Sequence, residues 1–214
     1  MKLERLLGYP DEPRTVDDLR DRGYNFDPAR VADLVAARGW HHDDRRQALP
    51  REPPGEPVPG GSFERAVALM RDYAFAEGSA VRAIFAADAP LEGRDMLLIG
   101  RFAGLDFRLG VRVTHVVDAR RDEDGRAVRV WGWSYGTLRG HLERGQMSYE
   151  VRKWLDTGEV EFRIAAVSHR ARVANPLVRL GFGLLGRREQ IKFYRHTCEV
   201  MARRTAAAVA APAG

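Results

Sequence analysis

Hydrophobic and polar positions alternate with a period of two through the middle of the chain. In residues 105–117 every second side chain is apolar except His115, and the intervening positions are mostly polar. The same alternation recurs in residues 131–135, 147–151 and 160–166. A period of two with one apolar face is typical of antiparallel strands that cover a core on one side. Because short Gly- and Asp-containing turns separate these segments, they predict a meander of successive strands.

On both sides of this region the apolar residues are spaced three and four apart, as on one face of a helix. This spacing predicts one helix in residues 62–78 and a long helix that ends near residue 208. Residues before 50 contain shorter pieces of the same pattern, which predict short helices. Between these short helices and the helix predicted from residue 62 lies the run PREPPGEPVPGG. Its five prolines and three glycines favour an extended connector.

Four segments are therefore expected. Residues 1–49 are predicted to form a short helical N-terminal appendage, and residues 50–61 a Pro/Gly-rich connector. Residues 62–205 would form the main domain, and residues 206–214 a flexible tail. The main domain is predicted to be α+β, with a curved antiparallel sheet of about six strands gripping a long C-terminal helix. A sheet of this size curls because its strands twist, which leaves room for a cavity under the helix.

Composition narrows the class of protein. The 214 residues include 35 Lys and Arg against 30 Asp and Glu, and the two signs are interleaved along the chain. This small excess, without a groove-reading motif, argues against nucleic-acid binding. No apolar run is long enough for a transmembrane segment, and the single cysteine fits a reducing compartment, so a cytoplasmic protein is expected. Weak self-association is left open.

The run WGWSYGTLRGHLERGQMSYEV, together with GRDMLLIGRF, GEVEFRIAAVSHRA and NPLVRLGFGLLGRR, carries a family resemblance. The sequence resembles the DUF1990 (UPF0548) family of uncharacterised proteins, which is similar to the Bet v 1-like, START-like (SRPBCC) helix-grip superfamily. The resemblance covers roughly residues 60–204. Its motif falls on Tyr135, Gly136, Thr137, Leu138, Gly140, His141, Glu143 and Gly145, whereas Gln146 stands where a glutamate is expected.

The resemblance implies binding of a hydrophobic small molecule, lipid-, sterol- or polyketide-like, between the sheet and the C-terminal helix. The inward-facing positions of the predicted elements supply the candidate ligand-binding residues: Phe107, Val111, His115, Trp131, Trp133, Tyr135, Tyr149, Phe162, Ile191, Tyr194 and Met201. Each of these also has a plain interpretation as a core residue, because large aromatic side chains dominate protein interiors.

Two polar residues are candidates for chemistry. His141 and Glu143 lie in a Gly-bounded turn, where they either hold the turn by bonding its backbone or transfer protons at the cavity mouth. The second interpretation gives an alternative function, a cyclase- or hydrolase-like enzyme on the same fold. A third is a protein-interaction module with a solid core. No metal site and no cofactor are expected, because the chain has no ligand cluster at useful spacing and no phosphate-binding loop.

Overall fold

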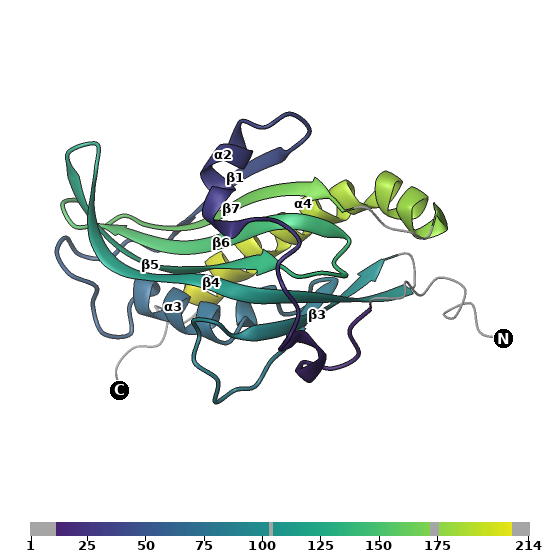
Figure 1. Cartoon of the computed structure of the whole chain (residues 1–214). Coiled ribbons are helices and arrows are strands. Elements are labelled where there is room, and N and C mark those ends of the chain that lie inside the picture. Colours follow the sequence, from purple (N-terminus) through teal and green to yellow (C-terminus); the bar gives the residue numbers. More distant parts are fainter. Residues whose placement is uncertain (1–11, 103–104, 172–175, 207–214) are drawn as a thin grey trace.

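The computed structural model of the chain describes residues 12–102, 105–171 and 176–206 (Figure 1). Its elements in chain order are the 3-10 helices η1 (Asp17–Leu19) and η2 (Pro28–Arg30), helix α2 (Val31–Val35), strand β1 (His41–Leu49), helix α3 (Ser62–Arg71), the 3-10 helix η3 (Ala74–Ala76), strands β2 (Val81–Ile84), β3 (Asp95–Phe102), β4 (Leu105–Glu123), β5 (Arg126–Thr137), β6 (Glu143–Trp154) and β7 (Val160–Arg170), and helix α4 (Pro176–Ala206). The predicted tail lies outside the described residues from position 207 onward.

The seven strands form one antiparallel sheet in the order β1-β7-β6-β5-β4-β3-β2. From β2 to β7 each strand pairs with its neighbour in sequence, which confirms the predicted meander. Helices α3 and α4 pack on one face of this sheet, and Figure 1 shows α4 running along it. The predicted fold class, a curved sheet gripping a long C-terminal helix, is therefore confirmed, with seven strands instead of about six.

The additional strand, β1, comes from the last part of the predicted helical appendage, whose earlier part holds η1, η2 and α2. It pairs with β7 along its whole length, from His41 opposite Ser168 to Leu49 opposite Val160. The sequence of β1, HHDDRRQAL, lacks alternating apolar residues because the strand lies at the edge of the sheet. Charged side chains are common on edge strands, where they prevent pairing with further chains.

The segment before β1 packs against the outer face of the sheet, as the purple trace in Figure 1 shows. Leu19 is fully buried there in a second apolar cluster with Leu97, Ile99 and Leu138. The guanidinium of Arg112 donates to the backbone carbonyls of Leu19, Arg20 and Arg22. A Cβ atom at Gly110 would approach the Leu19 side chain to 2.6 Å, so glycine there lets the segment lie close to the strand.

The Pro/Gly-rich connector is extended, but it packs against the turn between β6 and β7. Backbone hydrogen bonds join Glu52 N to Gly158 O at 2.9 Å and Gly55 N to Leu155 O at 2.7 Å. The Glu52 carboxylate accepts from Lys153 Nζ at 2.7 Å and from the Phe63 backbone N–H at 2.8 Å. The connector is thus built into the main body and closes one end of the sheet, whereas the prediction had it separate the two parts.

The main core lies between the sheet and the two helices. The inward side chains Trp131 and Trp133 of β5 and Tyr149 of β6 are at most 4% exposed. The Trp133 and Tyr149 ring centroids lie 5.1 Å apart, and Trp133 Nε1 donates to the Met70 carbonyl at the end of α3. Helix α4 adds the buried residues Tyr194 and Met201 to the same cluster. Most of the interior is therefore packed.

His115 does not face this core, contrary to the prediction. The register between β4 and β5 shifts between Val113 and His115, so the regular alternation of β4 breaks at this point. One extra residue in a strand moves all later side chains to the opposite face. His115 is consequently exposed, while Val116 packs against the core.

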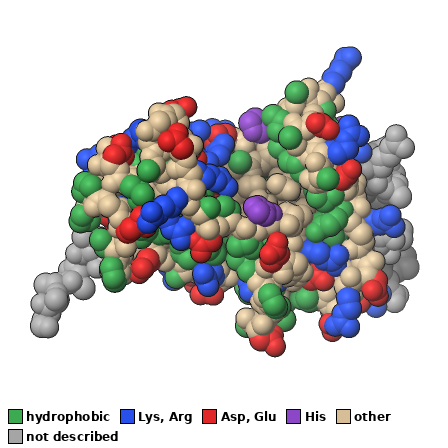
Figure 2. Space-filling model, turned by 60° about the vertical axis from the view of Figure 1, so that its left-hand side comes forward, with side chains coloured by type: hydrophobic (Ala, Val, Ile, Leu, Met, Phe, Trp, Pro, Cys, Tyr) green, Lys and Arg blue, Asp and Glu red, His purple; other side chains and the backbone are tan. Residues whose placement is uncertain are grey.

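Charged side chains of both signs share the surface. On the face drawn in Figure 2, blue and red side chains are interspersed and do not gather into separate patches. Many of the arginines pair with carboxylates, as in Arg163 with Asp44 and Arg126 with Asp156. No helix among the described residues is long and apolar enough to cross a membrane.

Candidate functional site

The end of the sheet opposite the connector contains the turn between β5 and β6. Thr137, the last residue of β5, bonds to Gly145 of β6, whose N–H donates to Thr137 Oγ1 at 2.9 Å. Asn25 of the N-terminal segment accepts from Thr137 Oγ1 at 2.6 Å and donates to the Glu143 carbonyl at 2.9 Å. Gly145 has φ 144°, and a Cβ atom there would meet the Val167 carbonyl at 2.0 Å. These contacts hold the start of β6 in one position.

His141 is part of this turn and its ring is tied to the backbone. Nδ1 lies 2.9 Å from the Glu143 backbone nitrogen and 3.0 Å from the Glu143 carbonyl oxygen, so it accepts in one tautomer and donates in the other. Burial lowers the pKa of His141 to about 4, although its bond to the Glu143 backbone acts in the opposite direction. The imidazole is therefore neutral at pH 7 and stabilises the turn.

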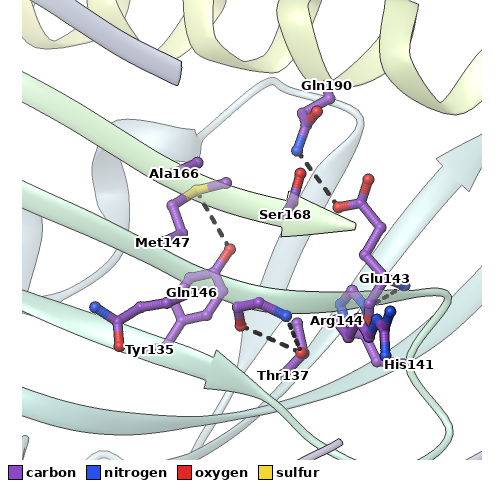
Figure 3. Close-up of a pocket in the computed structure, with 11 residues that line it drawn as sticks. Tyr135, Thr137, His141, Glu143, Arg144, Gln146, Met147, Ala166, Ser168 and Gln190 are labelled. Atoms are coloured by element: carbon purple, nitrogen blue, oxygen red, sulfur yellow. Dashed lines mark hydrogen bonds between the residues drawn. The ribbon is translucent and has the colours of Figure 1, made fainter. Parts of the chain in front are cut away.

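Glu143 points in a different direction from His141. Figure 3 shows its carboxylate reaching toward Gln190 of α4, away from the turn. Gln190 Nε2 donates to Glu143 Oε2 at 3.4 Å, the one hydrogen bond of this carboxyl among the described residues. Burial raises the pKa of Glu143 to about 7; Arg187 and Arg170 lower it, and Asp43 raises it further. A carboxyl with a pKa near neutrality is suited to exchange a proton or to bind a polar ligand group.

The Glu143 and His141 side chains border a cavity of about 90 Å³ between the sheet and α4. Most of its wall is apolar or aromatic. It is lined by Tyr73, Val81, Leu98, Leu109, Tyr135, His141, Glu143, Met147, Gly186, Glu189, Gln190 and Phe193. A smaller hollow of about 30 Å³, drawn in Figure 3, shares Tyr135, Glu143 and Gln190 with it and extends toward Thr137 and Ser168.

Tyr73 contributes an unsatisfied polar group to the cavity wall. The residue is 5% exposed, and its hydroxyl lies near those of Tyr135 and Tyr149 but makes no hydrogen bond of ordinary geometry with a described residue. The backbone of Tyr73 is left-handed, with φ 56°, between α3 and η3. Side chains other than glycine adopt this conformation at a cost of about 1 kcal/mol or more. Buried hydroxyls are normally paired, so this one marks a place where a ligand could bond.

An ion pair fastens α4 above the site. The Arg187 guanidinium donates to both carboxylate oxygens of Asp43 on β1 at 2.5 Å, and to Gln190 Oε1 at 2.8 Å. Gln190 is thereby held where its amide meets Glu143. Among the residues that the structure describes, no group of three or more His, Cys, Asp or Glu side chains could hold a metal ion.

The structure brings together three of the residues predicted from the sequence: Tyr135, His141 and Glu143 all line the cavity. The other inward candidates do not line it. The buried ones pack in the core, namely Val111, Trp131, Trp133, Tyr149, Phe162, Tyr194 and Met201. Phe107 and Ile191 are partly buried, and His115 is exposed on the other face.

Several lining residues were missed from the sequence. Leu109 and Met147 lie on the predicted inward faces of their strands, so alternation alone could have found them. Phe193 follows the helical spacing of α4 only loosely, and Tyr73 sits in an irregular turn. No pattern distinguishes an apolar residue that borders a small cavity from one that packs against a neighbour.

This architecture defines a helix-grip protein with a small, polar-tipped cavity between the sheet and the C-terminal helix. The family described as "Domain of unknown function (DUF1990)" matches residues 29–204, which is most of the chain, and the chain belongs to that family. The matched range includes β1, in agreement with its place in the sheet. No curated protein matches the chain.

Solved structures with a similar fold share little sequence with the chain. A hypothetical protein from Helicobacter pylori is 12% identical with a TM-score of 0.47, covering 84% of this chain and 95% of its own. A norcoclaurine synthase from Thalictrum, crystallised with a transition-state analogue, is 6% identical with a TM-score of 0.47, covering 80% and 96%. A major latex-like protein from Panax ginseng is 8% identical with a TM-score of 0.44, covering 78% and 99%.

Proposed function

We propose that the protein binds a small, largely apolar molecule in the cavity between the sheet and α4. The observation that carries this proposal is an aromatic and aliphatic cavity that also presents the Glu143 carboxyl and a buried Tyr73 hydroxyl without a well-formed hydrogen bond to a described residue. An apolar wall with a few convergent polar groups is the usual composition of a small-molecule site. The apolar part of the ligand would displace water, and the polar groups would orient it.

The cavity volume limits the size of the ligand. A water molecule takes about 10–15 Å³ of such a volume, so 90 Å³ accommodates about six to nine non-hydrogen atoms. A sterol or a long lipid of the kind expected from the resemblance is larger than this. It would need α4 to move away from the sheet, which would break the ion pair between Arg187 and Asp43. We therefore favour a ligand of the size of one substituted ring.

Native mass spectrometry of the purified full-length protein tests this function. A small non-covalent adduct that disappears under denaturing conditions is the expected result, and its mass would identify the ligand class. Leu98→Phe, which places a larger side chain in the cavity wall, should abolish the adduct. Ile164→Leu is the matched control, because Ile164 is buried in the core but does not line the cavity. An adduct that persists in Leu98→Phe would contradict binding in this cavity.

A bare protein mass that stays bare after incubation with small aromatic compounds would also contradict the proposal. That result would favour the alternative of an interaction module with a solid core.

Acid–base catalysis by Glu143 is the second candidate function. The pKa of about 7 favours it, because a general acid or base works best when its pKa is near the operating pH. His141 would not take part in proton transfer, since its ring nitrogen bonds to the backbone of Glu143 and not to the carboxyl. Once a ligand is identified, incubation with the wild-type protein and with Glu143→Gln separates the two functions. Conversion of the ligand by the wild type alone would establish catalysis.

A further inference from the structure

Among the described residues, the charged side chains of the cavity wall are acidic. Glu143 and Glu189 line it and no described lysine or arginine does, whereas Arg144 lines the adjoining smaller hollow. Glu189 pairs with Lys192, one turn along α4, at 2.6 Å. The Lys192 side chain is 56% exposed, so this pair is screened by water and contributes little to neutralising the cavity. An anionic ligand would therefore meet carboxyl groups without a cation to receive it.

The cations nearest to Glu143 are already engaged. Arg187 uses both of its terminal nitrogens on Asp43 and also reaches Gln190. Arg170, on β7, acts on Glu143 through its charge and has further interactions. Arg144, next to Glu143 on β6, lines the smaller hollow with it, and its guanidinium lies over the Trp40 ring and donates to His169 at 3.4 Å. The other titratable groups near Glu143 among the described residues are His141 of the same turn, Asp43 of β1, Tyr135 of β5 and Tyr194 of α4, and none of them carries a positive charge at pH 7. Among the described residues, the carboxyl thus forms no ion pair of its own.

Aromatic rings complete the surroundings. Tyr73, Tyr135 and Phe193 line the same cavity as the two carboxyl groups. The faces of aromatic rings attract cations, with a strength of about 0.5–2 kcal/mol that increases as water is excluded. A wall that combines acidic side chains and aromatic rings, with no basic side chain among the described residues, favours a positively charged ligand.

We propose that the ligand is a small organic amine, bound as its ammonium ion, with the nitrogen at Glu143 and the apolar part against Tyr73, Leu98 and Phe193. This inference rests on the ligand-binding function proposed above and specifies its chemistry. The ammonium ion would supply hydrogen-bond donors and a positive charge to the Glu143 carboxyl, whose hydrogen bond among the described residues comes from Gln190.

Amine binding should depend on pH in a defined direction. In the empty protein about half of the Glu143 carboxyls are protonated near pH 7, and an ammonium ion binds the ionised form. Binding therefore releases a proton, and affinity falls as the pH falls below 7. For a group of this pKa, the affinity at pH 6 should be about tenfold weaker than at pH 8. A neutral ligand of the same shape should show no such fall.

Isothermal titration calorimetry with three ligands of similar shape tests the inference: 2-phenylethylamine, 2-phenylethanol and phenylacetate. The amine should bind most tightly at pH 8 and lose about tenfold at pH 6, and phenylacetate should bind least. Glu143→Gln should weaken amine binding at pH 8 by tenfold or more and alcohol binding much less, because only the amine loses an opposite charge. Glu189→Gln should have a smaller effect in the same direction. Glu199→Gln, at an exposed position on the same helix, is the matched control.

Failure of the inference can be distinguished from failure of the proposed function. If the alcohol binds as tightly as the amine at pH 8, or Glu143→Gln leaves amine affinity unchanged, the ligand is not an amine but the cavity remains a binding site. A non-basic adduct in the native mass spectrum would lead to the same conclusion. If the amine does not bind at either pH, the inference fails. The mass spectrum of Leu98→Phe then decides separately whether the cavity is used at all.

Discussion

Two glutamates at opposite ends of the same sheet, Glu52 buried and Glu143 half-buried, show how differently a carboxyl can be used. Glu52, in the connector, is bonded by Lys153 and by the backbone N–H groups of Val58 and Phe63. Burial by itself would raise the pKa of Glu52, but these partners together lower it below the ordinary value of 4.5. Glu143, at the cavity, has one long hydrogen bond among the described residues, from Gln190, and burial raises its pKa to about 7.

The contrast separates structural from functional roles. A fully partnered carboxylate stabilises the fold, and losing a partner is costly. A carboxyl that borders a cavity without enough partners costs stability and retains the capacity to bond to something else. We therefore assign Glu52 to closing the sheet at the connector and propose Glu143 for the ligand. Each of the following changes tests one side of this comparison.

Lys153→Met should have the largest effect. The side chain of Lys153 is fully buried, and methionine keeps much of its volume while removing the charge. Glu52 would then be a buried carboxylate without its cation, which should lower the free energy of unfolding by about 3–5 kcal/mol. Urea denaturation at pH 7 measures this loss. The double variant with Glu52→Gln should recover much of it, and a loss below about 1 kcal/mol in Lys153→Met would refute the structural role.

Glu143→Gln should instead become relatively more stable as the pH rises. Between its unfolded pKa near 4.5 and its folded pKa near 7, Glu143 holds its proton more tightly in the folded protein. This group's contribution to stability is therefore complete below pH 4.5 and declines as the pH rises to 7. Glu143→Gln has no carboxyl at this position, so its free energy of unfolding does not decline in this way. The difference in free energy of unfolding between variant and wild type should therefore increase by up to about 3 kcal/mol between pH 4.5 and pH 8.

Urea denaturation of both proteins at several pH values gives this difference directly. The two curves must be subtracted because His141 also contributes a pH dependence. Burial lowers its pKa to about 4, so its contribution to the free energy of unfolding increases with pH over an overlapping range. Glu199→Gln should parallel the wild type. A pH-independent difference for Glu143→Gln would mean that this carboxyl has an ordinary pKa.

Tyr73→Phe should have the smallest effect. Like Glu143→Gln at high pH, it should raise the free energy of unfolding. The change removes a buried hydroxyl that has no partner among the described residues, so stability should rise by about 1 kcal/mol. Thr137→Val is the contrasting control, because the Thr137 hydroxyl bonds to Asn25 and Gly145 and its removal should cost about 1–3 kcal/mol. Thermal unfolding measures both. A loss of stability in Tyr73→Phe would indicate that the hydroxyl is satisfied.

Much of the fold could be predicted from the sequence because its central strands bury one face only. Alternation identified β4 to β7, and helical spacing identified α3 and α4. Alternation is absent from β1. Its sequence, HHDDRRQAL, is mostly polar, and the strand lies at the sheet edge, where it is held by backbone pairing with β7. His115 was misplaced because a shift in register leaves no mark in the pattern of apolar residues.

The candidate site could be predicted only in part. The family resemblance and the turn glycines predicted that His141 and Glu143 belong to the site. They did not predict that the His141 ring bonds to the turn backbone whereas the Glu143 carboxyl faces the cavity. That distinction depends on contacts distant in sequence, such as Gln190 with Glu143 and Arg187 with Asp43. Glu52 lay in a proline-rich segment that carried no signal of a buried ion pair, since its partner Lys153 is about a hundred positions away.

Direct titration of the two glutamate carboxyls by carbon-13 nuclear magnetic resonance would test the central comparison most directly. Glu143 is expected to titrate near pH 7 in the empty protein and at lower pH when 2-phenylethylamine is bound. Glu52 is expected to titrate below 4.5 in both states. If Glu143 titrates near 4.5 without ligand and does not respond to the amine, the carboxyl is already satisfied and the proposed site is wrong.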